Sequence, residues 1–160
     1  MNVQEATTRR LPDLKERHLP ENCRETINTI LKETYGYEQF RHLEIYDDLS
    51  KGKEKLCISQ GQLIENVILE AEKAWKSETQ VDNILLTAPT GSGKSLLFQL
   101  PAIYLGKEYN LLTIVVSPLK ALIVDQVESL QELGYARVAY ASSDLSPEQK
   151  MEVYRQVREG

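Results

Sequence analysis

The chain has 160 residues, of which 41% are hydrophobic and 27% charged, and its formal net charge is -5 at pH 7. These values are ordinary for one globular domain. The acidic balance excludes a globally basic nucleic-acid binder, although an acidic protein can carry a local positive groove. No apolar run approaches the roughly 20 residues that cross a bilayer, and no signal-peptide core follows the N-terminus. We therefore expect a cytoplasmic protein that makes no membrane contact.

The first part of the chain favours helices. Residues 1–19 mix charges with proline and show no apolar period, which predicts an extended lead-in. Apolar residues recur at helical spacing over 21–35, and Gly36 ends that pattern. A second helix is predicted over 37–49, and a third, opened by the polar stretch SQGQ, has an apolar face over 63–75. Residues 1–57 are thus expected to form an N-terminal helical extension.

The apolar pattern changes in the second part of the chain. Short continuous apolar runs at 84–88, 111–117 and 136–142 are typical of strands that are buried on both faces. Helical patterns alternate with these runs. One has an inward face from Leu119 to Leu133 and ends at Gly134, and another starts at Ser146 and Pro147. This order predicts an α/β fold, with a parallel sheet and crossover helices, over 58–160.

The turn after the first predicted strand has the composition of a phosphate-binding loop. Its backbone N–H groups can point into one concavity and are contributed by Thr90, Gly91, Ser92 and Gly93. Lys94 would reach the β- and γ-phosphates of a nucleotide, and the Ser95 hydroxyl would be a ligand of Mg²⁺. Lys94 and Ser95 are therefore the catalytic candidates, whereas a glycine-serine linker that happens to precede a lysine is the alternative.

The loop and its flanks resemble a known helicase group. The stretch A-x-T-G-x-G-K-S, with Ala88 in place of the usual first glycine, is similar to motif I of superfamily-two helicases and translocases. The continuation GKSLLFQLPA, followed by TIVVSPLKALIVDQVESLQELG, resembles the RecQ branch, and this likeness covers 58–160. The resemblance implies a partial RecA-like lobe that binds ATP and Mg²⁺. It also implies that the complete enzyme hydrolyses ATP and acts on single-stranded or forked DNA.

The same resemblance implies a segment that contacts DNA, called motif Ia, where the second predicted strand ends. The residues assigned to it are Ser117, Pro118, Leu119, Lys120 and Gln126. Lys120 is the candidate contact to a DNA phosphate. The family commonly has a lysine just before D-Q-V, whereas this chain has Val124 there. Lys120 and Gln126 are also compatible with ordinary solvated helix positions.

Upstream of the loop, the family has a glutamine that reads the adenine edge, in a segment like F-G-Y-x-x-F-R-x-G-Q. Two stretches compete for this role: YGYEQFRHLE, which has Glu44 where the glutamine should be, and ISQGQLIENVI, which supplies Gln62. We assign Gln62, because an amide can both donate to adenine and accept from it. A glutamine that only caps a helix is the alternative.

Hydrolysis of a nucleotide also needs an acidic pair that holds Mg²⁺ and an arginine that stabilises the transferred phosphoryl group. Neither is identifiable in this sequence, and the resemblance implies that both follow residue 160. We therefore expect the first part of a larger motor, which alone neither hydrolyses ATP nor unwinds DNA. Two alternatives remain open: a non-enzymatic nucleotide or nucleic-acid binding module, and another P-loop enzyme such as a small-molecule kinase.

Overall fold

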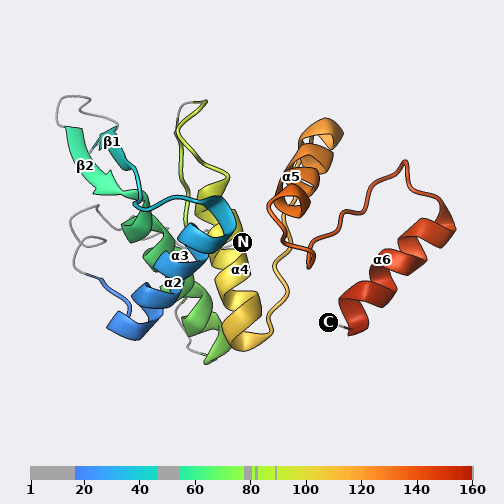
Figure 1. The fold of residues 1–160 in the computed structure, drawn as a ribbon, viewed down its shortest axis with the longest axis horizontal. Coiled ribbons are helices and arrows are strands. Elements are labelled where there is room, and N and C mark those ends of the chain that lie inside the picture. The colour runs from blue at the N-terminus through green and yellow to red at the C-terminus, as the bar shows by residue number, and fades with distance from the viewer. Residues whose placement is uncertain (1–16, 47–54, 78–80, 82, 89, 160) are drawn as a thin grey trace, which may run out of the picture.

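The fold is seen in a computed structural model that describes residues 17–46, 55–77, 81, 83–88 and 90–159. Most of the extended lead-in expected over 1–19 lies outside these residues. The described part is mostly helical, with one small antiparallel sheet. Helices α2 (Glu21–Tyr35), α3 (Gln60–Trp75) and α4 (Leu96–Tyr109) pack side by side, α5 (Lys120–Glu132) contacts α4 along its Gln126 side, and α6 (Pro147–Glu159) lies apart (Figure 1).

The hydrophobic core lies between α2, α3 and α4. Each helix supplies one apolar stripe, as the helical spacing predicts. The fully buried side chains at the centre are Ile27, Ile30, Leu31, Ile58, Ile64, Ile68, Leu100 and Ile103. The N-terminal helix and the helix after the phosphate loop therefore share one core. The domain boundary predicted at residue 57 falls inside strand β2 (Lys55–Ser59).

The predicted end of the first helix and the predicted start of the last helix are confirmed. Gly36 adopts a left-handed conformation (φ 69°), and its N–H donates to the last carbonyls of α2. Ser146 caps α6, because its Oγ accepts from the Gln149 N–H at 3.2 Å while the Gln149 Oε1 accepts from the Ser146 N–H at 2.8 Å. Pro147 opens that helix as expected. These signals are local, so the sequence alone was sufficient to place them.

The helix predicted over 37–49 is wrong. Strand β1 (His42–Tyr46) lies there and pairs antiparallel with β2 in a register that matches His42 with Ser59. The side chains of β2 alternate, since Ile58 is fully buried and Cys57 is exposed. Pairing with a segment further along the chain outweighs the local helical pattern here. The part of the prediction over 47–49 lies outside the described residues.

The parallel sheet predicted over 58–160 is not formed, because the β1–β2 pair is the only ladder among the described residues. The segments expected as strands are largely open to solvent: Leu85 is 92% exposed, Ile114 77% and Val116 90%. A parallel strand needs hydrogen-bonded neighbours and helices on both faces of the sheet. The described residues supply neither, so the apolar runs indicate strand composition without forming strands.

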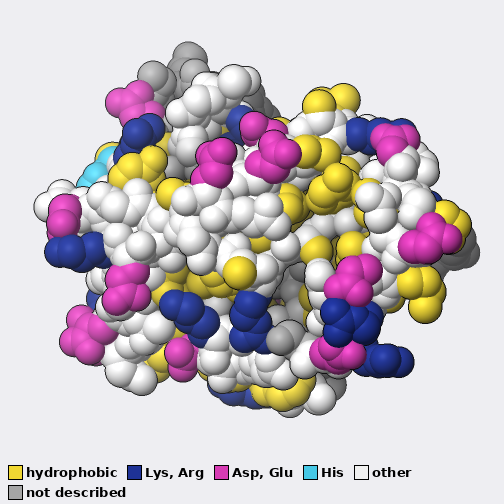
Figure 2. Space-filling model, turned by 45° about the vertical axis from the view of Figure 1, so that its right-hand side comes forward, with side chains coloured by type: hydrophobic (Ala, Val, Ile, Leu, Met, Phe, Trp, Pro, Cys, Tyr) yellow, Lys and Arg dark blue, Asp and Glu magenta, His cyan; other side chains and the backbone are white. Residues whose placement is uncertain are grey.

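The inward face predicted for α5 is only partly correct. Val127 and Leu130 are buried, but Leu119, Leu122 and Leu133 are between 43% and 63% exposed. With no sheet beneath it, α5 has little apolar surface to pack on. Figure 2 turns the side with α5 and α6 forward and shows hydrophobic side chains open to solvent on that face.

A proline inside a helix commonly kinks or ends it, but α4 continues through Pro101 to Tyr109. Pro101 is buried within the three-helix core. Because this helix packs against both α2 and α3, tertiary contacts hold the turns on either side of the proline. Among the helices that the structure describes, none is long and apolar enough to cross a lipid bilayer.

Candidate nucleotide-binding site

The phosphate loop runs directly into α4, so its backbone is continuous with a helix N-terminus. Gly91 (φ 81°) and Gly93 (φ 77°) both adopt the left-handed conformation, which side chains disfavour. Ser95 immediately precedes the first residue of α4, and its carbonyl accepts the Gln99 N–H at 2.9 Å. The N–H groups of Leu96 and Leu97 donate to the carbonyls of Gly93 and Lys94 at 3.2 and 3.0 Å, so the helical turn extends back into the loop, and its dipole favours an anion there. The predicted turn and helix start are therefore both present.

The two glycines of the loop have different surroundings. A Cβ atom on Gly91 would meet no protein atom within 4 Å, so that position faces open space. A Cβ atom on Gly93 would lie 2.6 Å from Nε2 of Gln60. Gly93 is thus required both by its backbone angle and by the side chain that packs against it, whereas Gly91 is required by its angle alone.

The lysine of the loop folds back onto the loop itself. Lys94 Nζ donates to the backbone carbonyl of Ala88 at 2.6 Å, in a position that is exposed to solvent. The ammonium therefore lies across the loop from which it projects, and a phosphate could exchange with the Ala88 carbonyl as its partner. Thr90 is exposed, and Ser92 and Ser95 are half-buried, so the loop residues are accessible.

Mg²⁺ fits this loop only together with a nucleotide. Across the described residues, no group of three His, Cys, Asp or Glu side chains could hold a metal ion. Ser95 would supply one hydroxyl ligand, and Mg²⁺ commonly completes its shell with phosphate oxygens and waters. The donors present therefore suit a Mg²⁺ that arrives with the phosphates rather than a resident metal site.

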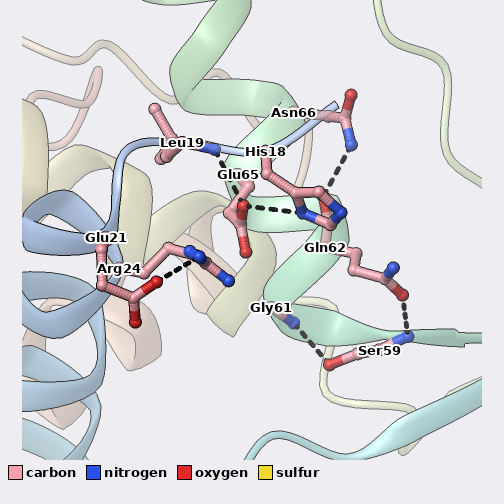
Figure 3. A network of polar contacts seen from close by, with 9 residues as sticks. All are labelled: His18, Leu19, Glu21, Arg24, Ser59, Gly61, Gln62, Glu65 and Asn66. Carbon is pink, nitrogen blue, oxygen red and sulfur yellow. Dashed lines mark hydrogen bonds and ion pairs between the residues drawn. The ribbon is translucent and has the colours of Figure 1, made fainter. Parts of the chain in front are cut away.

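Gln62, the predicted adenine reader, caps a helix in this structure. Its Oε1 accepts the Ser59 N–H at 3.1 Å, and Ser59 Oγ accepts the Gly61 N–H at 3.1 Å. Figure 3 shows the Gln62 amide nitrogen on the side away from Ser59. Gln62 also lines a cavity of about 200 Å³ together with Phe40, Arg24 and others. The capping alternative is thus observed, and the reading of adenine stays a prediction.

The two stretches that competed for the adenine-reading role are brought together by the fold. The ring of Phe40 packs on Gly61, because a Cβ there would lie 2.7 Å from its Cδ2. The Gln60 N–H donates to the Arg41 carbonyl at 2.9 Å, so the chain before β1 meets the chain after β2. The stretches F-R at 40–41 and Q-G-Q at 60–62 therefore lie against each other, although the β1–β2 hairpin separates them in sequence.

A buried carboxylate fastens the chain before α2 to α3, next to these two stretches. Glu65 is 8% exposed, and its Oε2 accepts the Leu19 N–H at 3.1 Å while His18 Nδ1 lies 3.5 Å from the same oxygen (Figure 3). Further along α3, Glu70 pairs with Arg17 at 2.7 Å. These contacts hold the start of α2 against the helix that begins with the Q-G-Q stretch.

Four of the residues assigned to motif Ia lie together, where the chain enters α5. The Ser117 hydroxyl accepts the Leu119 N–H at 3.3 Å, and Pro118 and Leu119 are exposed. Lys120 donates to Asp144 at 2.6 Å, and this contact holds the pKa of the Asp144 carboxyl below its usual range. Lys120 is thus on the surface, as a phosphate contact must be, but it already forms an ion pair with Asp144.

Gln126, the fifth residue assigned to motif Ia, faces the protein rather than solvent. Its Oε1 accepts from Gln99 Nε2 at 2.8 Å, and Gln99 Oε1 in turn accepts from the Tyr35 hydroxyl at 3.2 Å. Burial raises the pKa of the Tyr35 hydroxyl, with a further contribution from the nearby Tyr135, so Tyr35 remains a donor. This chain of amides links α5 to α4 one turn beyond the phosphate loop, and it was not predicted.

Gln60 also contacts the phosphate loop and was not predicted as a site residue. Its side chain is 2% exposed and contacts the carbonyls of Ser92 and Gly93 at 3.1 and 3.4 Å. The available signal was a polar residue between the buried Ile58 and the G-Q pair, at a position that the family pattern leaves open. Its partners lie more than 30 residues away, so spacing alone could not identify them.

The chain is similar to known helicases. A family model described as DEAD/DEAH box helicase matches residues 68–159, which include the phosphate loop and the segment assigned to motif Ia. The chain is 32% identical over 132 residues to an ATP-dependent DNA helicase RecQ of Synechocystis, and 32% identical over 130 residues to the RecQ-like DNA helicase blm-1 of Caenorhabditis elegans. It is 30% identical over 135 residues to an ATP-dependent DNA helicase RecQ of Haemophilus influenzae.

These matches cover most of this chain and a small part of each relative. They include 82%, 81% and 84% of the chain, but 21%, 10% and 17% of the Synechocystis, Caenorhabditis and Haemophilus proteins. A search of solved structures found no match. The resemblance to RecQ helicases noted in the sequence is confirmed by these relatives. Because the family model matches more than half of its residues, the chain belongs to the DEAD/DEAH box helicase family.

Proposed function

We propose that this chain is the ATP-binding part of a RecQ-like DNA helicase. The observation that carries the proposal is the loop with two left-handed glycines that runs directly into α4, with Lys94 folded across it. This arrangement combines backbone N–H groups, a helix N-terminus and the Lys94 ammonium, which together suit a polyphosphate. Family membership further supports a fragment of a RecA-like lobe in the part of the chain that the family model matches, residues 68–159.

Three side chains, of Lys94, Ser95 and Gln62, have proposed roles in binding Mg²⁺ and ATP. Lys94 would exchange the Ala88 carbonyl for the β- and γ-phosphates, and its charge would offset theirs. The Ser95 hydroxyl would be a ligand of Mg²⁺, which supplies positive charge to the phosphates when it is bound. The Gln62 amide nitrogen would donate to the adenine, while its oxygen continues to cap α3.

Single-stranded or forked DNA is the proposed partner. The segment formed by Ser117, Pro118 and Leu119 lies on the surface at the start of α5, where backbone groups could meet a DNA strand. Lys120 would contact a phosphate after leaving Asp144. Gln126 is held by Gln99, so its proposed part is to orient α5, and direct contact with DNA would require that bond to break.

Hydrolysis is proposed to need groups from elsewhere in a longer protein. The sequence contains no Asp-Glu pair of the kind that holds Mg²⁺ in this family. We therefore expect the 160-residue chain to bind ATP without turning it over, and unwinding to require further domains.

A phosphate-release assay with and without single-stranded DNA tests whether the chain binds ATP without hydrolysing it. The expected result is bound ATP with no release above background. Turnover that Lys94→Ala abolishes would show instead that the chain contains a complete catalytic site. Absence of nucleotide binding would remove the proposed function altogether.

A further inference from the structure

Gln60 is a buried polar residue at the first position of α3, and its side chain has a full set of partners. It is 2% exposed, so each polar atom needs a hydrogen bond within the protein. Its Oε1 accepts the Arg41 N–H at 3.2 Å. Its Nε2 donates to the carbonyl of Ser92 at 3.1 Å and to that of Gly93 at 3.4 Å.

These contacts join three segments that are distant in sequence. The backbone of Gln60 also donates to the Arg41 carbonyl at 2.9 Å, so both polar backbone groups of Arg41 are bonded to this one residue. Arg41 precedes the β1–β2 hairpin, Gln60 follows it, and Ser92 belongs to the phosphate loop. The carboxamide of Gln60 therefore connects the base of the hairpin to the loop that would hold the phosphates.

The direction of these bonds determines how the loop presents its N–H groups. In a trans peptide the carbonyl of one residue and the N–H of the next point in opposite directions. The carbonyls of Ser92 and Gly93 lie within hydrogen-bonding distance of Gln60 Nε2, and that of Gly93 also accepts the Leu96 N–H at 3.2 Å, so the N–H groups of Gly93 and Lys94 point away from Gln60. Successive N–H groups that point to one side are what a phosphate-binding concavity requires.

Steric contact fixes the same arrangement. Gln60 Nε2 lies so close to Gly93 that a Cβ atom there would be 2.6 Å away. The side chain is held from its other end by Arg41, so it cannot withdraw without breaking that bond. The glycine and the glutamine therefore depend on each other, and a change at either one should alter the loop.

We propose that Gln60 is a positioning residue of the nucleotide site. Its carboxamide holds the carbonyls of Ser92 and Gly93 toward α3 and away from the phosphate-binding side of the loop. The N–H groups of Gly93 and Lys94 are thereby held toward the phosphates. Gln60 itself does not touch the nucleotide. The inference rests on the proposed function for the identity of the ligand, but the orientation of the loop can be measured without any ligand.

The first experiment measures the loop without nucleotide. Gln60→Glu keeps the size of the side chain but cannot donate to the two carbonyls, and Gln60→Leu removes all three of its side-chain hydrogen bonds. In ¹⁵N-labelled protein, both variants should shift or broaden the amide resonances of Gly93 and Lys94. Gln131→Glu, which makes the same chemical change at an exposed position of α5, should leave them in place. Unchanged loop resonances in both Gln60 variants would overturn the proposal.

The second experiment measures affinity for two probes, Mg·ATP and inorganic tripolyphosphate, which has phosphates and no base. Gln60→Glu should weaken both by a similar factor of roughly ten, because about two modest hydrogen bonds that orient the loop are lost. Unchanged affinities in a folded variant with a lower Tm would show a purely structural role and overturn the proposal. If the wild-type chain binds neither probe but its loop resonances respond to the Gln60 variants, the positioning role stands and the proposed function fails.

Discussion

Replacing each of the two loop glycines with alanine tests whether the observed geometry holds the phosphate loop. Gly91→Ala places a methyl group in open space, so its cost arises only from the left-handed backbone at φ 81°. That cost is about 1–2 kcal/mol for an L-residue. Gly93→Ala bears a similar backbone cost at φ 77° and also drives its methyl group into Gln60 Nε2.

The additional cost at Gly93 follows from the bonds of Gln60. A methyl group 2.6 Å from Nε2 must displace that nitrogen, which then loses its contacts to the Ser92 and Gly93 carbonyls. At about 0.5–1.5 kcal/mol for each hydrogen bond, the extra destabilisation should be about 1–3 kcal/mol. Alanine also restricts the unfolded chain, but this effect is the same at both positions and cancels in the comparison.

Urea unfolding followed by circular dichroism gives the free energy of unfolding of each variant without nucleotide. We expect Gly93→Ala to lose more stability than Gly91→Ala, and we expect this difference to vanish when both are made in a Gln60→Ala background. Equal losses at the two glycines would show that Gln60 Nε2 does not constrain Gly93. So would a difference that persists without the Gln60 side chain, because the steric conflict would then lie elsewhere.

Three further predictions concern side chains outside the loop. Glu65→Ala should cost about 1–3 kcal/mol in urea unfolding, because the Leu19 N–H loses its buried acceptor, whereas Glu65→Gln keeps an acceptor and should cost less. Asp144→Asn should release Lys120 and strengthen binding of a fluorescent single-stranded oligonucleotide, adding about 0.7 to the salt slope; an unchanged slope would contradict the contact. The hydrogen bond to Glu72 raises the pKa of the Tyr109 hydroxyl to about 12. The free energy of unfolding that this bond contributes is therefore present below pH 10 and should be lost between pH 10 and 12, and Tyr109→Phe should flatten that loss.

Local features of this fold were predictable from sequence, and features that depend on distant partners were not. Gly36 and Ser146 mark helix ends because their effects arise within one turn of the chain. The phosphate loop was identified for the same reason, since glycines, lysine and serine follow one another directly. Pairing of β1 with β2 depends on a second segment, so the apolar residues of β1 could be mistaken for a helix.

The site shows the same division. Gln62 was assigned from a pattern, and it lines one cavity with Phe40, which the sequence places 22 residues earlier. Gln60 became visible only when the fold brought Arg41 and the loop to its two ends. The apolar segment containing Ile114 was predicted as a strand because of its composition, but a strand also needs neighbours to bond with.

The most direct test of the central claim is isothermal titration of the 160-residue chain with Mg·ATP, in the wild type and in Lys94→Ala. Lys107→Ala, which removes the same charge from an exposed position at the far end of α4, is the matched control. We predict saturable binding that Lys94→Ala weakens at least about tenfold, as expected for loss of a charged contact to phosphate, and that Lys107→Ala leaves unchanged. Binding that is equally strong in Lys94→Ala, or no binding to the wild type, would contradict the assignment of this loop as the nucleotide site.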